Sequence, residues 1–208
     1  MSIFRSVLLL AVAGALVAGS GKTAPAKPTV VNPSFEEDRF GTYPGYAARQ
    51  GGRQRDITGW SYTGNVGLNP WWQNPAEQKG PNQPFSDNGV IPHGKQVALL
   101  QNKCTLSQSI PGFKAGKRYR VTYRENARHQ NRPDRIPKMK VALDGEIIVS
   151  EHAIEPVQPI NARNLPYDFV ESAVFVPPLD GTYDLVFTTT VSTGVTVLID
   201  DVRVEAVE

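Results

Sequence analysis

The chain has 208 residues, a formal net charge of +2 and a single cysteine. This length suits one folded domain with a sizeable core, which we place at residues 30–208. Because Cys104 has no partner in the chain, an internal disulfide is excluded. A lone thiol in an alternating segment is expected to behave as a small buried hydrophobe.

Residues 1–20 have the pattern of a secretory signal peptide. Arg5 precedes an almost wholly apolar run over 7–18, and small residues follow it. The run is shorter than the roughly 20 residues that a membrane span needs, so we expect cleavage, with an uncleaved anchor as the alternative. The mature chain is then expected to have no membrane span and to be secreted, periplasmic or at the cell surface, in a bacterium. Residues 21–29 are predicted to be a flexible spacer because they are rich in Pro, Ala and Lys.

Charge is distributed unevenly along the chain. Residues 114–140 hold ten Lys/Arg and two acids, whereas residues 141–208 hold two Lys/Arg and twelve acids. A basic block can mark an anionic partner. We favour the alternative that the two blocks lie on neighbouring strands and neutralise each other. No nucleic-acid partner is expected, because aromatic residues are sparse in the basic block and export argues against one.

Apolar and polar residues alternate with a period of two, and helical periodicity is nearly absent. In chain order, the segments predicted to form strands are 57–68, 95–101, 105–112, 118–128, 139–150, 169–178, 181–191 and 196–207. Asp144-Gly145 lies between two strand-like runs, which is the strongest short signal for a hairpin. Several short strands separated by turns predict one all-β sandwich or barrel.

The 118–128 segment has two distinct faces, because side chains alternate across a strand. Tyr119, Val121 and Tyr123 are expected to face the core, and so is Trp60 of the preceding region. The opposite, polar face of the segment holds Arg118, Arg120, Thr122, Arg124, Asn126 and Arg128.

Six fragments occur in the same order as in the galactose-binding-like jelly-roll domains. The fragments are VVNPSFEED, ITGWSYTGNV, IPHGKQVALLQ, LSQSIPGFKAGKRYRVTYRENAR, VALDG and VLIDDVRV. This chain resembles those domains over residues 30–204, and they include several carbohydrate-binding module families of bacterial polysaccharide-degrading enzymes. The resemblance implies a jelly-roll β-sandwich that binds a polysaccharide or another surface glycan.

The resemblance also implies a structural calcium ion that ties the first strand to the last. Its acidic ligands would be Glu36 of NPSFE and Asp200 of IDDV. Hard cations such as Ca²⁺ prefer carboxylate and carbonyl oxygens. The alternative is that both residues cap backbone groups or form salt bridges without a metal.

The NPWWQNP segment places two adjacent tryptophans in a Gly/Pro/Asn-rich stretch that runs from 40 to 88. Trp71 and Trp72 offer flat rings for stacking on sugars, and Asn74 offers an amide donor and acceptor beside them. Adjacent residues in an extended stretch point in opposite directions, so we expect one ring to be buried and the other exposed. The alternative is that a tryptophan closes the end of the core.

A second candidate binding surface is the polar face of the 118–128 segment. By the resemblance, Arg124, Asn126 and Arg128 would line a ligand-binding sheet face. Guanidinium groups form bidentate bonds to anionic groups, so such a face would favour carboxylated or sulfated glycans. The alternative is cross-strand pairing of the arginines with acids such as Glu125 or Glu146.

Enzymatic signatures are absent from the sequence. No G-x-S-x-G, H-E-x-x-H or P-loop spacing occurs, and the three histidines lie far apart. We therefore expect a non-catalytic binding protein. The alternatives are a structural or adhesive envelope protein that binds a protein partner, and a small glycan-active enzyme. Because a stand-alone binding module is unusual, a partner protein or a homo-oligomer is a further expectation.

Overall fold

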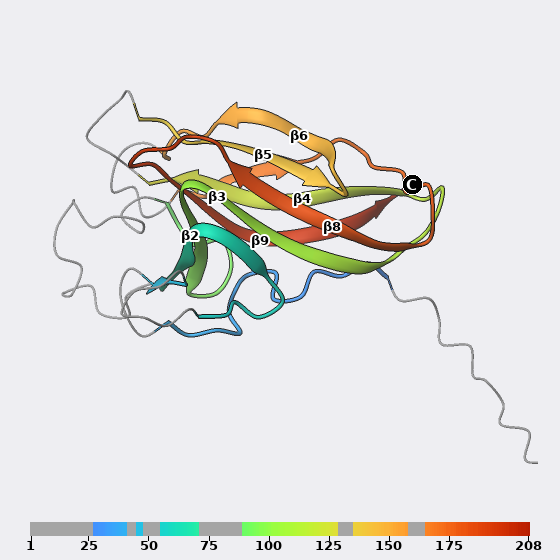
Figure 1. Ribbon diagram of the computed structural model, residues 1–208, viewed down its shortest axis with the longest axis horizontal. Helices are drawn as coiled ribbons and strands as arrows, with labels where there is room; N and C mark the ends of the chain where they lie inside the picture. Colours follow the sequence, from blue (N-terminus) through green and yellow to red (C-terminus); the bar gives the residue numbers. More distant parts are fainter. Residues whose placement is uncertain (1–26, 41–44, 48–54, 71–88, 129–134, 158–164) are drawn as a thin grey trace, which may run out of the picture.

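The computed structural model describes residues 27–40, 45–47, 55–70, 89–128, 135–157 and 165–208 (Figure 1). Within these ranges the chain forms strands and no helix, and so none that could cross a membrane. The strands are β1 (Gly45–Tyr46), β2 (Ser61–Pro70), β3 (Gln96–Phe113), β4 (Arg118–Ala127), β5 (Lys138–Leu143), β6 (Glu146–Ala153), β7 (Asp168–Glu171), β8 (Gly181–Thr189) and β9 (Thr196–Val207). The expected all-β architecture is confirmed.

The strands follow the order β6-β5-β8-β3-β9-β4-β7, with β2 paired to β3 and β1 to β2. Strand β3 is shared by two layers of a sandwich, because its second half pairs with β8 and its first half with β9. Figure 1 shows β6 and β5 at one edge of the molecule and β2 at the other.

The prediction of two separate strands, 95–101 and 105–112, is wrong, because β3 runs without a break from Gln96 to Phe113. Asn102 adopts a left-handed φ of 61°, a conformation that asparagine tolerates better than most residues. The chain therefore changes partners at this residue without leaving the strand.

By contrast, the predicted hairpin is confirmed: Asp144 and Gly145 have φ values of 50° and 84° and join β5 to β6. Positive φ at both central residues is the requirement of a type I′ turn.

The main core lies between the two layers and is rich in stacked aromatic rings. The Trp60 ring lies 5.3 Å from Phe35 and 6.3 Å from Phe187, and the Tyr123 ring lies 5.1 Å from Phe187. Tyr119, Val121, Tyr123 and Trp60 are buried, as predicted. Cys104 is buried as well, and burial raises the pKa of its thiol to about 11.

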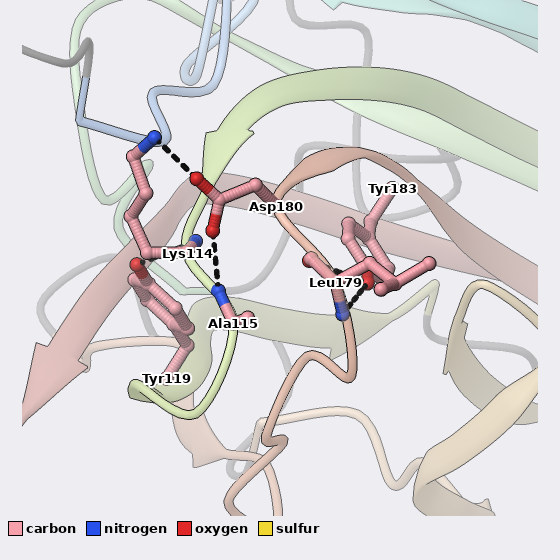
Figure 2. Close-up of polar contacts among 6 residues, drawn as sticks. All are labelled: Lys114, Ala115, Tyr119, Leu179, Asp180 and Tyr183. Carbon is pink, nitrogen blue, oxygen red and sulfur yellow. Dashed lines mark hydrogen bonds and ion pairs between the residues drawn. The ribbon is translucent and has the colours of Figure 1, made fainter.

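At one end of the sandwich, polar contacts join the turn after β3 to the residues before β8, beside Tyr119 and Tyr183, as Figure 2 shows. Lys114 Nζ lies 2.7 Å from Asp180 Oδ2, and the Ala115 N–H donates to Asp180 Oδ1 at 2.8 Å. The Lys114 N–H donates to the Tyr119 hydroxyl at 3.2 Å. A second pair, Arg120–Glu171, also joins the basic block to the acidic one, at 2.6 Å. The two charge blocks therefore neutralise each other at these contacts, as the sequence suggested.

Candidate functional site

Strand β4 turns one face toward the main core and the other toward a second, smaller hydrophobic cluster. We call this second surface the β4 outer face. It comprises Arg124, Asn126 and Arg128 of β4 and the residue after it, Thr196, Leu198 and Asp200 of β9, and Val97, Leu99 and Gln101 of β3. The register places Arg124 opposite Asp200 and Asn126 opposite Leu198. The structure thus brings the three predicted ligand-binding residues of β4 onto one surface.

Three segments cover the middle of the β4 outer face. Tyr167 packs with Val97, Leu99 and Leu198 in one buried cluster, and Tyr46 and Ile91 pack against it. The Val90 N–H donates to the Leu165 carbonyl at 2.8 Å, which joins two of the covering segments. The face is therefore apolar and covered at its centre, and its polar groups lie toward its two edges.

Asn126 lies beneath this cover and is fully buried. Its Oδ1 accepts hydrogen bonds from the Ala127 N–H at 2.8 Å and from the Val157 N–H at 3.0 Å. The side chain thus fastens the segment after β6 to strand β4. In this arrangement Asn126 supports the cover of the face and does not reach solvent.

Arg124 forms the first polar edge together with a residue that the sequence did not single out. Its guanidinium carbon lies 4.6 Å from the centre of the Phe169 ring, within cation–π range, and its Nη1 donates to the Tyr167 carbonyl at 3.4 Å. Phe169 is 52% exposed on the edge strand β7. An exposed aromatic on an alternating strand was the signal available in the sequence.

The second polar edge joins Tyr46, Gln101 and Arg128. The Tyr46 hydroxyl donates to Gln101 Oε1 at 2.8 Å. Burial raises the pKa of Tyr46, while the Gln101 hydrogen bond and the Arg128 charge oppose that rise. Thr196, opposite Gln101 in the register, has a buried hydroxyl oxygen without a hydrogen-bond partner among the described residues. Such an atom marks a place where water or a ligand group could bind.

Glu36 and Asp200 both hold the loop that leads into β3. Glu36 Oε1 accepts hydrogen bonds from the Lys95 and Gln96 N–H groups at 2.7 and 3.0 Å. Asp200 Oδ2 accepts one from the His93 N–H at 2.8 Å. A Cβ on residue 94 would lie 2.4 Å from Glu36 Oε1, and the φ there is 70°, so this position requires glycine.

A bulge in β9 directs Asp200 away from the main core. Thr122 pairs with Arg203 and Arg124 with Asp200, so one residue of β4 opposes two of β9. Asp201 has a left-handed φ of 51° at this point. The extra residue reverses the alternation, which leaves Asp200 on the β4 outer face and Val202 in the main core.

The charge of Asp200 is poorly compensated by the protein. Its side chain is fully buried, and burial raises its pKa to about 8 despite the His93 and Asp201 N–H donors. The charges of Asp201 and Glu36 raise this pKa further. A cation beside Asp200 and Glu36 would relieve this unfavourable charge, so the two carboxylates fit the demand of a hard cation. The described residues contain no cluster of three or more His, Cys, Asp or Glu side chains that could hold a metal, so further ligands would be carbonyl oxygens or water.

The predicted aromatic platform of Trp71, Trp72 and Asn74 lies outside the described residues. Strand β2 ends at Pro70, just before this segment. The platform therefore stays a prediction, as do the signal peptide at 1–20 and most of the spacer at 21–29.

No family model matches the sequence, and no curated protein matches it. Among solved structures, a cyclase from Fischerella sp. TAU in complex with 4-(1H-indol-3-yl)butan-2-one is similar over 86% of this chain and 97% of its own, with 13% identity and a TM-score of 0.54. The CBM22-1 xylan-binding domain of Xyn10C from Paenibacillus barcinonensis is similar over 89% of this chain and 99% of its own, with 13% identity and a TM-score of 0.50. TmCBM61 in complex with beta-1,4-galactotriose is similar over 88% of this chain and 100% of its own, with 14% identity and a TM-score of 0.48.

At these identities the likeness concerns the fold. The chain has the jelly-roll fold of carbohydrate-binding modules, as the sequence resemblance implied. Because the cyclase has a similar fold, the fold alone does not choose between binding and catalysis.

Proposed function

We propose that this protein is a secreted, non-catalytic carbohydrate-binding protein that recognises a polysaccharide or surface glycan at the edges of the β4 outer face. The fold is compatible with this role, but the site must carry the proposal. The observation that carries it is the exposed Phe169 ring stacked with Arg124 at 4.6 Å.

This pair combines the two contacts that an acidic sugar needs. An aromatic ring offers a flat apolar surface for the CH face of a pyranose. A guanidinium group forms paired hydrogen bonds to a carboxylate or a sulfate. Arg128 and the Tyr46–Gln101 pair supply charge and hydrogen-bonding groups at the other edge. We therefore favour a carboxylated or sulfated glycan over a neutral one.

The test is binding of the chain without residues 1–20 to neutral, carboxylated and sulfated polysaccharides, by affinity electrophoresis and calorimetry. We expect Phe169→Ala and Arg124→Ala each to weaken binding at least tenfold, the effect of about 1.4 kcal/mol. Arg203→Ala is the matched control, because Arg203 is an exposed arginine on β9 that pairs with Asp201 at 2.8 Å. Equal loss in all three variants would mean a non-specific charge effect and would overturn the proposed site.

A Trp71→Ala/Trp72→Ala double variant separates the two candidate surfaces. Loss of binding in this variant alone would move the site to the NPWWQNP segment. If the unaltered protein binds no glycan, the structural or adhesive alternative takes precedence, and a search for protein partners follows.

We also propose that Glu36 and Asp200 hold a calcium ion that fastens the 93–96 loop to strand β9. The support is the buried Asp200 carboxylate, whose pKa is raised to about 8 by burial and further by the charges of Asp201 and Glu36. Calcium should raise the melting temperature, because a ligand that binds only the folded state stabilises it. Asp200→Asn and Glu36→Gln should abolish that rise, and a melting temperature that does not respond to calcium or chelator would overturn the proposal.

Export can be tested separately. We expect the protein purified from its native host to begin after residue 20 and to be found outside the cytoplasm. An intact N-terminus on a membrane-bound protein would favour the uncleaved anchor.

A further inference from the structure

Glu125 is an acidic residue on the core-facing side of β4. Its carboxylate is almost wholly enclosed, with a side chain that is 6% exposed. Oε1 lies 2.7 Å from Nε2 of His152, which belongs to β6. Strands β6 and β7 are the two ends of the sheet order, and β7 pairs with β4. The contact therefore crosses the seam between β6 and the β4–β7 pair, where the two layers meet without a continuous ladder.

Other hydrogen bonds between described residues also cross this seam. At one end the Ala173 N–H donates to the Ile148 carbonyl at 2.8 Å. At the other end the Val157 N–H donates to Asn126 Oδ1 at 3.0 Å. Glu125–His152 is the charged contact of the three. It lies next to the point where the chain leaves β6 to cover the β4 outer face.

In the described part of the chain, the His152 imidazole is the positively charged group that lowers the pKa of the Glu125 carboxyl. Tyr123 and Asp168 also act on it, the latter from the opposing position on β7. Ile199 opposes Glu125 on β9, and Met139 opposes His152 on β5, and neither residue titrates. Among the described residues, neither Glu125 Oε2 nor the buried Tyr123 hydroxyl has a hydrogen-bond partner of ordinary geometry, although Tyr123 lies close enough to Glu125 to lower the pKa of its carboxyl.

The titration of the two groups is linked. Burial raises the pKa of Glu125, and the hydrogen bond and charge of His152 only partly oppose that rise. Burial lowers the pKa of His152, but its bonds to Glu125 and to the Ser150 carbonyl and the Glu125 charge together raise it above 6.5. The hydrogen bond and the opposite charges favour an imidazolium beside a carboxylate, so the two groups titrate as a coupled pair.

We propose that the Glu125–His152 contact is a pH-sensitive latch that holds the end of β6, and with it the segment from 154 to 157, against strand β4. When the pH rises above the pKa of His152, the imidazole loses its charge. The enclosed carboxylate then has no cation beside it, and it favours water over the seam. The end of β6 separates from β4, and the Val157–Asn126 contact opens with it.

The latch can be tested by amide hydrogen exchange, with rates corrected for the intrinsic effect of pH. The reporters are the Ile154 and Val157 amides, which donate to the Pro137 carbonyl and to Asn126. We expect their protection to fall about tenfold between pH 6 and pH 8.5, because the opening of this end of β6 exposes both amides to solvent. The Gly116 amide, which donates to the Pro177 carbonyl at the far end of the sandwich, should keep its protection.

In Glu125→Gln the pH step at Ile154 and Val157 should disappear, because an amide carries no charge to leave uncompensated. Glu151→Gln is the matched control, because Glu151 is an exposed acid on β6 next to His152, and it should keep the step. A protein without the step, or a Glu125→Gln variant that keeps it, would overturn the latch.

A second measurement is made on the unaltered protein, and a variant serves only to assign its resonances. The ring resonances of His152 should titrate above pH 6.5 in the unaltered protein, and His152→Gln identifies them among the three histidines. A His152 ring that titrates at or below pH 6.5 would overturn the latch as well. Both measurements are made without a glycan, so their outcome is independent of the proposed binding function.

Discussion

The His152–Glu125 and Lys114–Asp180 ion pairs have the same length, 2.7 Å, but opposite surroundings. The Glu125 side chain is 6% exposed, whereas that of Asp180 is 59% exposed. A carboxylate in water is solvated whether or not a cation is near it, so the exposed pair changes little when it breaks. An enclosed carboxylate depends on its partner, because removing that partner leaves a charge without solvent.

The two pairs also respond to pH in opposite directions. Burial raises the pKa of Glu125, and the net effect of its neighbours raises that of His152. At the exposed pair, the Lys114 hydrogen bond and the Ala115 N–H lower the pKa of Asp180. Desolvation dominates the pKa of Glu125, whereas hydrogen bonding dominates that of Asp180, so an equal distance says little about the energy of either pair.

The largest expected effect comes from removing the partner of the enclosed carboxylate. At pH 7, His152→Ala should lower the free energy of unfolding by about 2–4 kcal/mol, because Glu125 remains enclosed without a cation. Urea unfolding measures this loss. His152→Gln keeps a hydrogen-bond donor and should recover part of it. A loss in His152→Ala no larger than that in Lys114→Ala would mean that the two pairs do not differ as proposed.

The contrast between the pairs shows what alternation along a strand does and does not predict. The period-two pattern predicted that Tyr119, Val121 and Tyr123 face the core, and it placed Arg124 and Asn126 on one shared face; both were confirmed. The same pattern puts residue 125 on the core side.

The alternative that Glu125 pairs with the arginines across strands is nevertheless wrong. Its partner is His152, a residue of the opposite layer. An acid at a core position of an alternating strand was the signal for a buried pair. The identity of the partner depends on which strands face each other across the seam, and no local pattern contains that information.

For the candidate site as well, alternation predicted which face a residue lies on but not which residues of other strands it contacts. The arginine face follows from alternation, but the burial of Asn126 depends on Val157, which reaches it from beyond β6. The role of Phe169 depends on the pairing of β7 with β4, which opposes residue 169 to Arg124. Similarly, the outward direction of Asp200 depends on a bulge at Asp201 that the sequence IDDV does not reveal.

The second prediction extends the contrast to the whole pH range. The pKa of Glu125 is raised from its ordinary value of 4.5, and that of His152 from 6.5. The pKa of Asp200 is raised from 3.8 to about 8. A raised pKa contributes stability below the unfolded-state value, and that contribution is lost as the pH rises through the folded-state value. In the presence of a chelator, the free energy of unfolding should therefore fall steadily from pH 5 to pH 9. Urea titrations at each pH measure it, and a stability that rises over this range would contradict the assignment of these shifts.

The third prediction distinguishes the pH dependence that is due to Asp200 from the part that is due to Glu125 and His152. Asp200→Asn removes the largest of these shifts, so the decline between pH 5 and pH 9 should become shallower, although the part due to Glu125 and His152 remains. Calcium should widen the difference in free energy of unfolding between the unaltered protein and Asp200→Asn, because it binds the carboxylate of the folded unaltered protein and not the amide of the variant. The same urea titrations with and without calcium provide the measurement, and identical curves for the two proteins would mean that Asp200 does not titrate with folding.

The smallest effect is expected at the exposed pair. Asp180→Asn should leave the melting temperature at pH 7 unchanged within error, because water solvates both Lys114 and Asp180 when the contact is lost. The pKa of Asp180 is lowered from 3.8, so its contribution is present above that value and is lost as the pH falls through the lower folded-state value. Any difference between the variant and the unaltered protein should thus appear at neutral pH and vanish once the pH falls below the folded-state pKa of Asp180, opposite to the behaviour of Glu125→Gln. Thermal unfolding at low and high salt completes the test, because screening weakens an exposed pair far more than an enclosed one. A salt-insensitive loss of stability in Asp180→Asn would contradict the description of Lys114–Asp180 as an exposed, screened pair.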